Sequence, residues 1–233
     1  MIAALDHLVV GGSAGVYETL LGRRAVDGRL RTGNVGLRFE ANVSGLRSMA
    51  FATQDLDKAA TLLERRAVST TRKDEALALL GHGVAIGVVG KADEAPSPLT
   101  ADAASAVSSL DHVVVRTPDP ERAIAFYAGR LGLDLRLDRS NPKWGARLLF
   151  FRCGDLVVEI AHDLKKGVSD EPDHLWGLSW RVPDIAAAQA RLKSAGLDVS
   201  EPRDGRRPGS QVCTVKNGTE GVPTILIGGV GRW

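Results

Sequence analysis

Apolar and polar positions along the chain predict a repeated order of one strand, one helix and three further strands. The clearest copy begins with the apolar run 110–115, after which apolar residues recur at helical spacing across 120–131. Asp119 stands before this segment as a helix N-cap, and Gly132 follows it as the residue that ends the helix. Three strand-like runs come next, at 133–137, 147–153 and 156–161. The pattern therefore predicts a βαβββ unit.

The same order recurs in the rest of the chain. A further unit has a strand at 178–182, a helix at 185–195 and strands at 197–199, 211–215 and 224–227. Residues 49–66 match 178–195 without a gap, because their cap residues Asp55 and Asp184 are 129 positions apart. Near the start, Asp6-His7 repeats the Asp111-His112 dipeptide, but the unit that follows is shorter. We therefore expect four βαβββ units, of which the first is trimmed.

These units predict an α+β fold with two domains. Residues 91–109 are rich in Ala, Ser, Pro and Asp and lack sustained periodicity, which is typical of a linker. We expect one domain at 1–90, this linker at 91–109, and a second domain at 110–233.

Composition narrows the class of protein. The chain of 233 residues is 44% apolar, which is ample for packed cores, and its net charge of +2 gives no broad basic surface for nucleic acid. No run approaches the roughly 20 apolar residues of a membrane helix, and the sequence enters a strand pattern at once, so we expect neither a membrane helix nor a signal peptide. We expect a soluble cytoplasmic protein. Cys153 and Cys213 have no zinc-type spacing, so buried free thiols are expected.

Several short motifs together resemble the vicinal oxygen chelate superfamily, also called the glyoxalase, bleomycin-resistance and extradiol dioxygenase superfamily. They are Leu110-Asp111-His112-Val113-Val114, residues 119–127, Leu131-Gly132-Leu133, Asp155-Leu156-Val157-Val158-Glu159, and Val182-Pro183-Asp184-Ile185. The resemblance is strong from residue 110 onward and weak in the first 45 residues. It implies that paired βαβββ units form curved, partly open barrels, and that domains of this kind form homodimers. The cup inside each barrel holds a divalent metal or, in metal-free members, a bound drug.

The resemblance also implies candidate metal ligands. Family ligands come from the first and fourth strands of a unit, and His112 and Glu159 occupy those positions here. An imidazole and a carboxylate suit Zn, Ni, Mn, Co or Fe. His7 and Glu40 are the matching, weaker candidates in the first unit, and His174 is a further candidate from a loop.

The even-numbered units depart from the family pattern. Ser48 and Gly177 stand where a partner unit places its first-strand His, and Gly87 and Ile225 stand near its fourth-strand carboxylate. If neighbouring units pair, each cup receives one His and one Glu, which is fewer than the three protein ligands of an ordinary catalytic metal site. Metal binding and a metal-free cup therefore both remain open.

Other residues are candidates for contact with a substrate. The resemblance to glyoxalases and epimerases gives Glu159 a role as the base that removes a proton next to a carbonyl. Arg181 could hold a substrate carboxylate, and Trp144, Phe151 and Trp180 could form apolar cup walls. The loop 203–209 has two interpretations, a mobile loop near the cup mouth and an ordinary solvated turn, and the solvated turn is favoured.

Two classes of function follow. The first is a metal-dependent lyase or isomerase that acts on a small oxygen-rich molecule, with an extradiol dioxygenase as a variant that needs two His and one carboxylate. The second is a metal-free protein that sequesters a small molecule, as bleomycin-resistance members do. The pair His112 and Glu159 favours the first class, and the replaced ligands at Ser48 and Gly177 favour the second.

Overall fold

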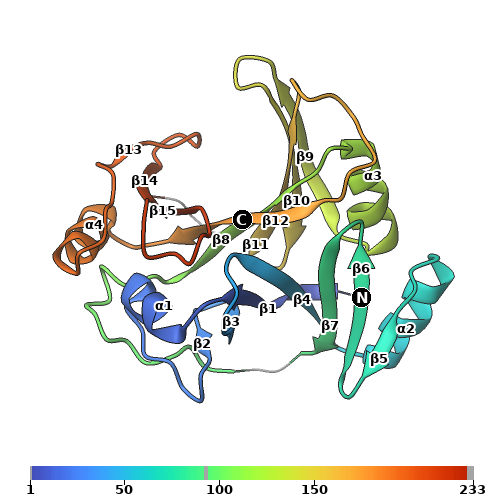
Figure 1. The fold of residues 1–233 in the computed structure, drawn as a ribbon, viewed down its shortest axis with the longest axis horizontal. Coiled ribbons are helices and arrows are strands. Elements are labelled where there is room, and N and C mark those ends of the chain that lie inside the picture. Colours follow the sequence, from blue (N-terminus) through green and yellow to red (C-terminus); the bar gives the residue numbers. More distant parts are fainter. Residues whose placement is uncertain (1, 92–93, 230–233) are drawn as a thin grey trace.

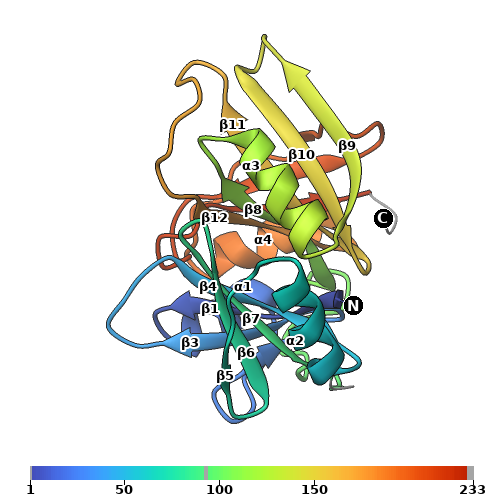
Figure 2. The same cartoon turned by 90° about the vertical axis from the view of Figure 1, so that its right-hand side faces the viewer.

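The chain folds into two curved sheets that lie back to back. The computed structural model describes residues 2–91 and 94–229. In Figure 1 the sheet of the N-terminal half curves downward and the sheet of the C-terminal half curves upward, so their concave faces open in opposite directions. Figure 2 shows the same two layers after a quarter turn. The predicted α+β class is confirmed, and the two sheets are consistent with four modules.

The N-terminal sheet has seven strands in the order β2-β3-β1-β4-β7-β6-β5. Within each unit the first strand pairs in parallel with the last strand, β1 with β3 and β4 with β7. The two units join through β1 and β4, which pair in antiparallel fashion. The elements of this half are β1 (Ile2–Gly11), α1 (Ala14–Leu21), β2 (Leu30–Arg31), β3 (Gly36–Glu40), β4 (Leu46–Thr53), α2 (Leu56–Arg65), β5 (Thr71–Lys73), β6 (Ala76–Gly81) and β7 (Val84–Gly90). The first unit is trimmed, as predicted.

The C-terminal sheet has eight strands in the order β13-β14-β15-β12-β8-β11-β10-β9. The units again meet through their first strands, because β12 pairs with β8 in antiparallel fashion. The elements are β8 (Ser109–Arg116), α3 (Pro120–Ile124), the π-helical turn η1 (Ala125–Arg130), β9 (Asp134–Asn141), β10 (Ala146–Cys153), β11 (Leu156–Asp163), β12 (His174–Arg181), α4 (Ile185–Ser194), β13 (Arg203–Asp204), β14 (Gln211–Val215) and β15 (Thr224–Gly228).

Local signals explain most element boundaries. The carboxylates of Asp55, Asp119 and Asp184 each accept backbone N–H bonds from the first turn of their helices, which confirms all three predicted caps. The helix predicted across 120–131 changes to π geometry after Ile124, since the Leu131 N–H bonds to the carbonyl five residues earlier. The strand predicted at 197–199 is wrong: its only sheet pairing among the described residues is an isolated bridge from Val199 to Val215.

A common hydrophobic core fills the space between the convex faces of the two sheets. It includes Val113 and Phe151 from the C-terminal sheet and Leu8 and Met49 from the N-terminal sheet. The division into domains at 1–90 and 110–233 stays a prediction, and linker residues 92–93 and the terminal residues 230–233 lie outside the described part of the chain.

Two predicted cup residues belong to this core instead of a cup. Phe151 and Trp180 are fully buried on the convex side, so their assignment as cup walls is wrong. Side chains alternate between faces along a strand, and Phe150 therefore faces the concave side, where it lies opposite Glu159. The adjacent aromatic residues gave no sign of which one faces the core.

Both cysteines are buried free thiols, as predicted. Burial raises the pKa of Cys153 to about 12 and that of Cys213 to about 11. No helix in residues 2–91 and 94–229 has the length and apolar character needed to cross a membrane.

Candidate functional site

The concave face of the C-terminal sheet brings His112 and Glu159 together. His112 lies on β8 and Glu159 on the neighbouring strand β11, and His112 Nε2 is 3.6 Å from Glu159 Oε2. Their side chains are 16% and 12% exposed, so both groups are shielded yet reachable. The walls of this cup are the β9–β10 hairpin on one side and β13 to β15 on the other (Figure 1).

A β-bulge orients the imidazole of His112. Residues His112 and Leu110 of β8 pair with the consecutive residues Ser179 and Trp180 of β12, so Asp111 is the extra residue between them. The bulge turns Asp111 so that its carboxylate meets His112 Nδ1 at 2.8 Å. An imidazole N–H donating to a carboxylate fixes the tautomer and leaves Nε2 as the outward-facing atom.

Asp111 is fully buried, and three side chains contact its carboxylate. Its carboxylate accepts hydrogen bonds from Arg181 Nε at 2.7 Å and from Arg207 Nη2 at 3.1 and 3.2 Å, in addition to the contact with His112. Burial alone raises the pKa of Asp111, but the hydrogen bonds from His112 and Arg181 and the charge of Arg207 outweigh it and lower the pKa to about 2. Asp111 is therefore ionised at neutral pH.

Arg181 has partners within the protein, and its contact with a substrate stays a prediction. Its guanidinium is buried, donates to Asp111, and donates to the Asp155 carbonyl oxygen at 2.9 Å. Strand β12 runs from Ser179 to Arg181 without an extra residue, so alternation keeps both side chains on one face, where Arg181 reaches the carboxylate of the β8 bulge. Arg181 thereby holds the carboxylate that orients His112.

Sequence reasoning missed Asp111 and Arg207 as site residues. The signal for Asp111 was present, because the Asp-His dipeptide occurs at the same position in two units. Arg207 comes from the loop between β13 and β14 that was interpreted as a solvated turn, and its side chain is only 30% exposed. No local pattern marks such a contact, which joins residues 96 positions apart.

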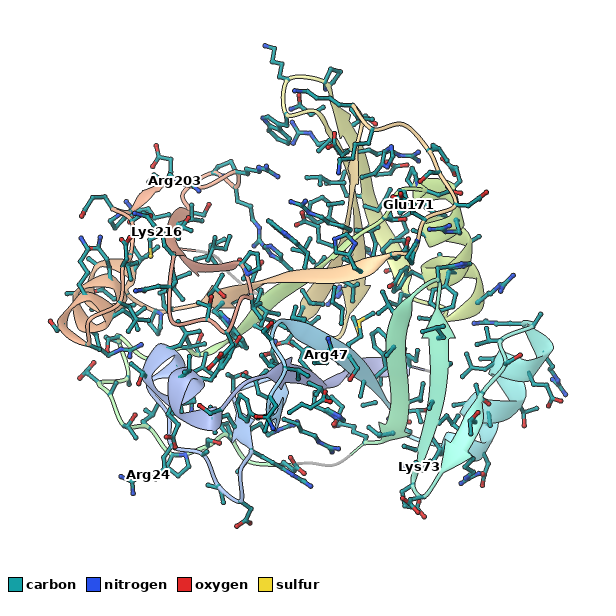
Figure 3. The ribbon with its side chains drawn as sticks, in the orientation of Figure 1. Arg24, Arg47, Lys73, Glu171, Arg203 and Lys216 are labelled. Carbon is teal, nitrogen blue, oxygen red and sulfur yellow. The ribbon has the colours of Figure 1, made fainter. Side chains whose placement is uncertain are left out.

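The same loop meets the opposite wall at the mouth of the cup. The guanidinium of Arg206 lies over the Trp144 ring, 4.4 Å from its centroid, and that of Arg139 lies 5.0 Å away. Trp144 is in the turn between β9 and β10 and is 42% exposed. Figure 3 shows Arg203 and Lys216 on the wall across from that hairpin, with side chains filling the space between. Trp144 therefore belongs to the rim of the cup, not to its floor.

The partner unit offers no strong ligand opposite His112. The residue in register with His112 is Ser179, Gly177 lies opposite Val114, and Ile225 lies beside Ser179 on β15. The Ser179 hydroxyl is buried and has no hydrogen-bond partner within the described residues. In the described ranges, no group of three or more His, Cys, Asp or Glu side chains could hold a metal ion.

The other histidines lie away from this pair. His174 is in strand β12 and not in a loop, and it pairs with Arg116, four residues from His112 and so about 13 Å along β8. Its predicted movement into the site has no support from this register. His162 is buried in β11, where Nδ1 contacts the Thr117 carbonyl, and His82 occupies a turn.

The first unit repeats the bulge but not the carboxylate. Asp6 is the extra residue between Leu5 and His7, and it contacts His7 Nδ1 at 2.7 Å. His112 pairs with Val157, two residues before Glu159, and His7 pairs with Gly36, two residues before Arg38. The match of Glu40 to Glu159 is therefore wrong. Glu40 pairs with Gly11 and forms an ion pair with Arg47 at 3.7 Å.

The C-terminal donor types fit a divalent cation. With Nδ1 held by Asp111, the Nε2 lone pair of His112 and the Glu159 carboxylate are two acceptors that face each other, and such a pair needs a proton or a metal ion between them. Two protein donors leave the remaining coordination positions to substrate oxygens and water. His7 and Glu40 cannot add to this set, because they belong to the other sheet.

Comparison with known proteins gives one family. The family model of the Glyoxalase/Bleomycin resistance protein/Dioxygenase superfamily matches residues 109–217. An ethylmalonyl-CoA/methylmalonyl-CoA epimerase from Cereibacter sphaeroides is 29% identical over 109 residues, which cover 42% of this chain and 81% of the epimerase. A lactoylglutathione lyase from Salmonella typhimurium is 25% identical over 122 residues, which cover 51% of this chain and 90% of the lyase.

Solved structures of the same fold extend over the whole chain. The 2,2',3-trihydroxybiphenyl 1,2-dioxygenase from Sphingomonas wittichii has a TM-score of 0.74 at 17% identity and covers all of this chain and 92% of its own. The Mn(II)-bound glyoxalase from Novosphingobium aromaticivorans has a TM-score of 0.73 at 13% identity, with coverage of 99% and 83%. At these identities the likeness concerns the fold alone.

Proposed function

Because the chain belongs to the glyoxalase/bleomycin resistance protein/dioxygenase superfamily, we propose that it is a lyase or isomerase that acts on a small oxygen-rich molecule in the C-terminal cup. The observation that carries this proposal is the approach of His112 Nε2 to Glu159 Oε2 at 3.6 Å on the concave face. The family model matches residues 109–217, the part of the chain that contains this pair.

Each residue of the pair has a defined role. Glu159 accepts and returns the proton at the carbon next to a substrate carbonyl, and a positioned carboxylate of this kind contributes roughly 10²- to 10⁴-fold to the rate. Asp111 is a positioning residue that holds His112 through Nδ1. A divalent metal would be held by His112 Nε2 and Glu159, and it would supply Lewis acidity toward the substrate oxygen. The Arg206–Trp144 contact bridges the two walls at the mouth of the cup.

Metal titration of the full chain tests the site directly. We expect binding of Mn²⁺, Co²⁺, Ni²⁺ or Zn²⁺ at about one ion per chain, and a fall to below about one tenth in His112→Ala and in Glu159→Gln. His174→Ala is the matched control, since it removes a histidine of the same sheet that lies about 13 Å along the strand. A wild-type content below about one tenth would contradict the metal-dependent form of the proposal.

A second experiment tests proton transfer. We expect deuterium from solvent to enter methylmalonyl-CoA, ethylmalonyl-CoA or S-lactoylglutathione, the compounds that the names of the relatives indicate. Glu159→Gln should slow this exchange by at least about 100-fold. Exchange at an unchanged rate in that variant would refute the role of Glu159.

A metal-free binding protein is the second candidate function. The observation that favours it is the set of residues facing His112, where Ser179, Gly177 and Ile225 supply no imidazole or carboxylate. The same gap argues against an extradiol dioxygenase, which needs a second His. The metal content of the purified protein distinguishes these two candidate functions. Formation of a homodimer stays a prediction.

A further inference from the structure

A pocket of about 570 Å³ opens on the concave face of the N-terminal sheet, at the end formed by β1, β2 and β3. Its floor contains His7, Gly36 and Arg38, and residues 94–98 line its outer side. A volume in this range is enough for a small molecule. The pocket is separate from the cup of His112 and Glu159, because the two sheets open in opposite directions (Figure 1).

His7 presents one ring nitrogen to this pocket. Its side chain is 9% exposed and lines the cavity, while Nδ1 is held by the Asp6 carboxylate at 2.7 Å. The nitrogen left for a ligand is therefore Nε2, which accepts a hydrogen bond when Nδ1 carries the proton. The Asp6 carboxylate, which also lines the pocket, is engaged by the contact with Nδ1.

On the strand next to His7, Arg38 occupies the position that corresponds to Glu159. Arg38 pairs with Val9 as Glu159 pairs with Val114, so the first unit has an arginine where the third unit has a carboxylate. Within the described residues, no hydrogen bond or ion pair occupies its guanidinium, and the side chain is exposed. This exchange of Glu for Arg removes the carboxylate that the third unit has at this position and favours an anion beside Arg38.

The other charged residues around the pocket are paired or lie at its rim. Arg31 Nε donates to the Glu94 carbonyl at 3.1 Å, and Arg31 Nη1 lies 3.6 Å from the Glu94 carboxylate, so both groups tie residues 94–98 to β2. Asp27 and Arg29 are exposed and of opposite charge. Asp6 also lines the pocket, where its carboxylate is hydrogen-bonded to His7 and lies within electrostatic reach of Arg38. Arg38 is thus a cation of the pocket floor that no ion pair among the described residues occupies.

We propose that this pocket binds a small organic carboxylate, held by the guanidinium of Arg38 beside His7. The planar fork of arginine matches both carboxylate oxygens, and the space beside Gly36 receives the remainder of the molecule. A Cβ at residue 36 would lie 3.3 Å from Arg31 Nη1 and 3.4 Å from His7 Cβ, so glycine keeps this part of the floor open. The site does not depend on the function proposed for the C-terminal cup.

Calorimetric and NMR titration of the full chain with succinate, benzoate and inorganic phosphate tests this proposal. We expect a dissociation constant below about 10 mM for at least one carboxylate, with a shift of the His7 imidazole resonances. Arg38→Leu should weaken binding at least about tenfold, and Arg38→Lys should give an intermediate value because it keeps the charge and loses the fork.

Two control variants make the result specific. Arg47→Leu removes another exposed arginine of the same sheet, labelled in Figure 3, which is outside the pocket and paired with Glu40. Arg207→Leu removes the cation of the other cup. Both should leave binding unchanged. Absence of carboxylate binding, equal binding of phosphate, or loss in Arg207→Leu but not in Arg38→Leu would each overturn the proposal.

Discussion

The substitution Asp111→Asn tests the charge cluster under the C-terminal cup. Asparagine has nearly the same shape, but it removes the charge that His112, Arg181 and Arg207 share, and it directs an N–H donor toward groups that are themselves donors. Arg181 is then left as a buried guanidinium without a counterion.

Two routes give the magnitude of this effect. The pKa of Asp111 falls from 3.8 to about 2 on folding, and a shift of nearly two units corresponds to about 2 kcal/mol of stability at neutral pH. Removal of one partner of a buried ion pair costs about 3–5 kcal/mol. Both figures describe the same contacts and do not add, so we expect a loss of about 3 kcal/mol in the free energy of unfolding.

The effect should depend on pH in a defined direction. Because the folded pKa of Asp111 lies below its unfolded value, its contribution is present above about pH 4 and is lost as the pH falls toward 2. Urea denaturation at pH 7 and near pH 3 measures it, with equal m-values as the check on two-state unfolding. The gap between wild type and Asp111→Asn should narrow at the lower pH.

The first repeat supplies a matched control. Asp6 occupies the same bulge beside His7, but among the residues that the structure describes no arginine donates to its carboxylate, and Arg31 Nη1 donates to its backbone oxygen. We expect Asp6→Asn to cost about 1 kcal/mol. A loss below about 1 kcal/mol for Asp111→Asn, or equal losses for both variants, would refute the argument that the buried arginine contact dominates.

Other predictions concern the mouth of the cup and the thiols. Trp144→Ala should lower the free energy of unfolding by less than about 1 kcal/mol. It should speed amide hydrogen exchange in the loop that carries Arg206 and Arg207. Unchanged exchange in that loop would mean that the cation–π contact does not hold it. Cys153 and Cys213 should react with a thiol reagent at pH 8 only as fast as the chain unfolds, because burial raises the pKa of both thiols; rapid labelling of the native protein would contradict this.

The sequence by itself determined the order and ends of most elements. Helix caps such as Asp119 act within one turn, and strand alternation is a property of a few consecutive residues, so both can be recognised locally. The pairing of His112 with Glu159 followed from the resemblance and depended on the parallel contact of β8 and β11, which the repeated unit implies.

Only the tertiary structure decided which side chains share a cup. A bulge adds one residue to a strand, and the bulge in β8 turned the Asp111 carboxylate toward both His112 and Arg181, so that Arg181 is engaged within the protein. Register decided that Arg38, and not Glu40, corresponds to Glu159, because deletions in the first unit obscure the alignment. The contact of Arg207 with Asp111 spans 96 positions, and such contacts arise from the packing of a loop on a sheet, which no local pattern encodes.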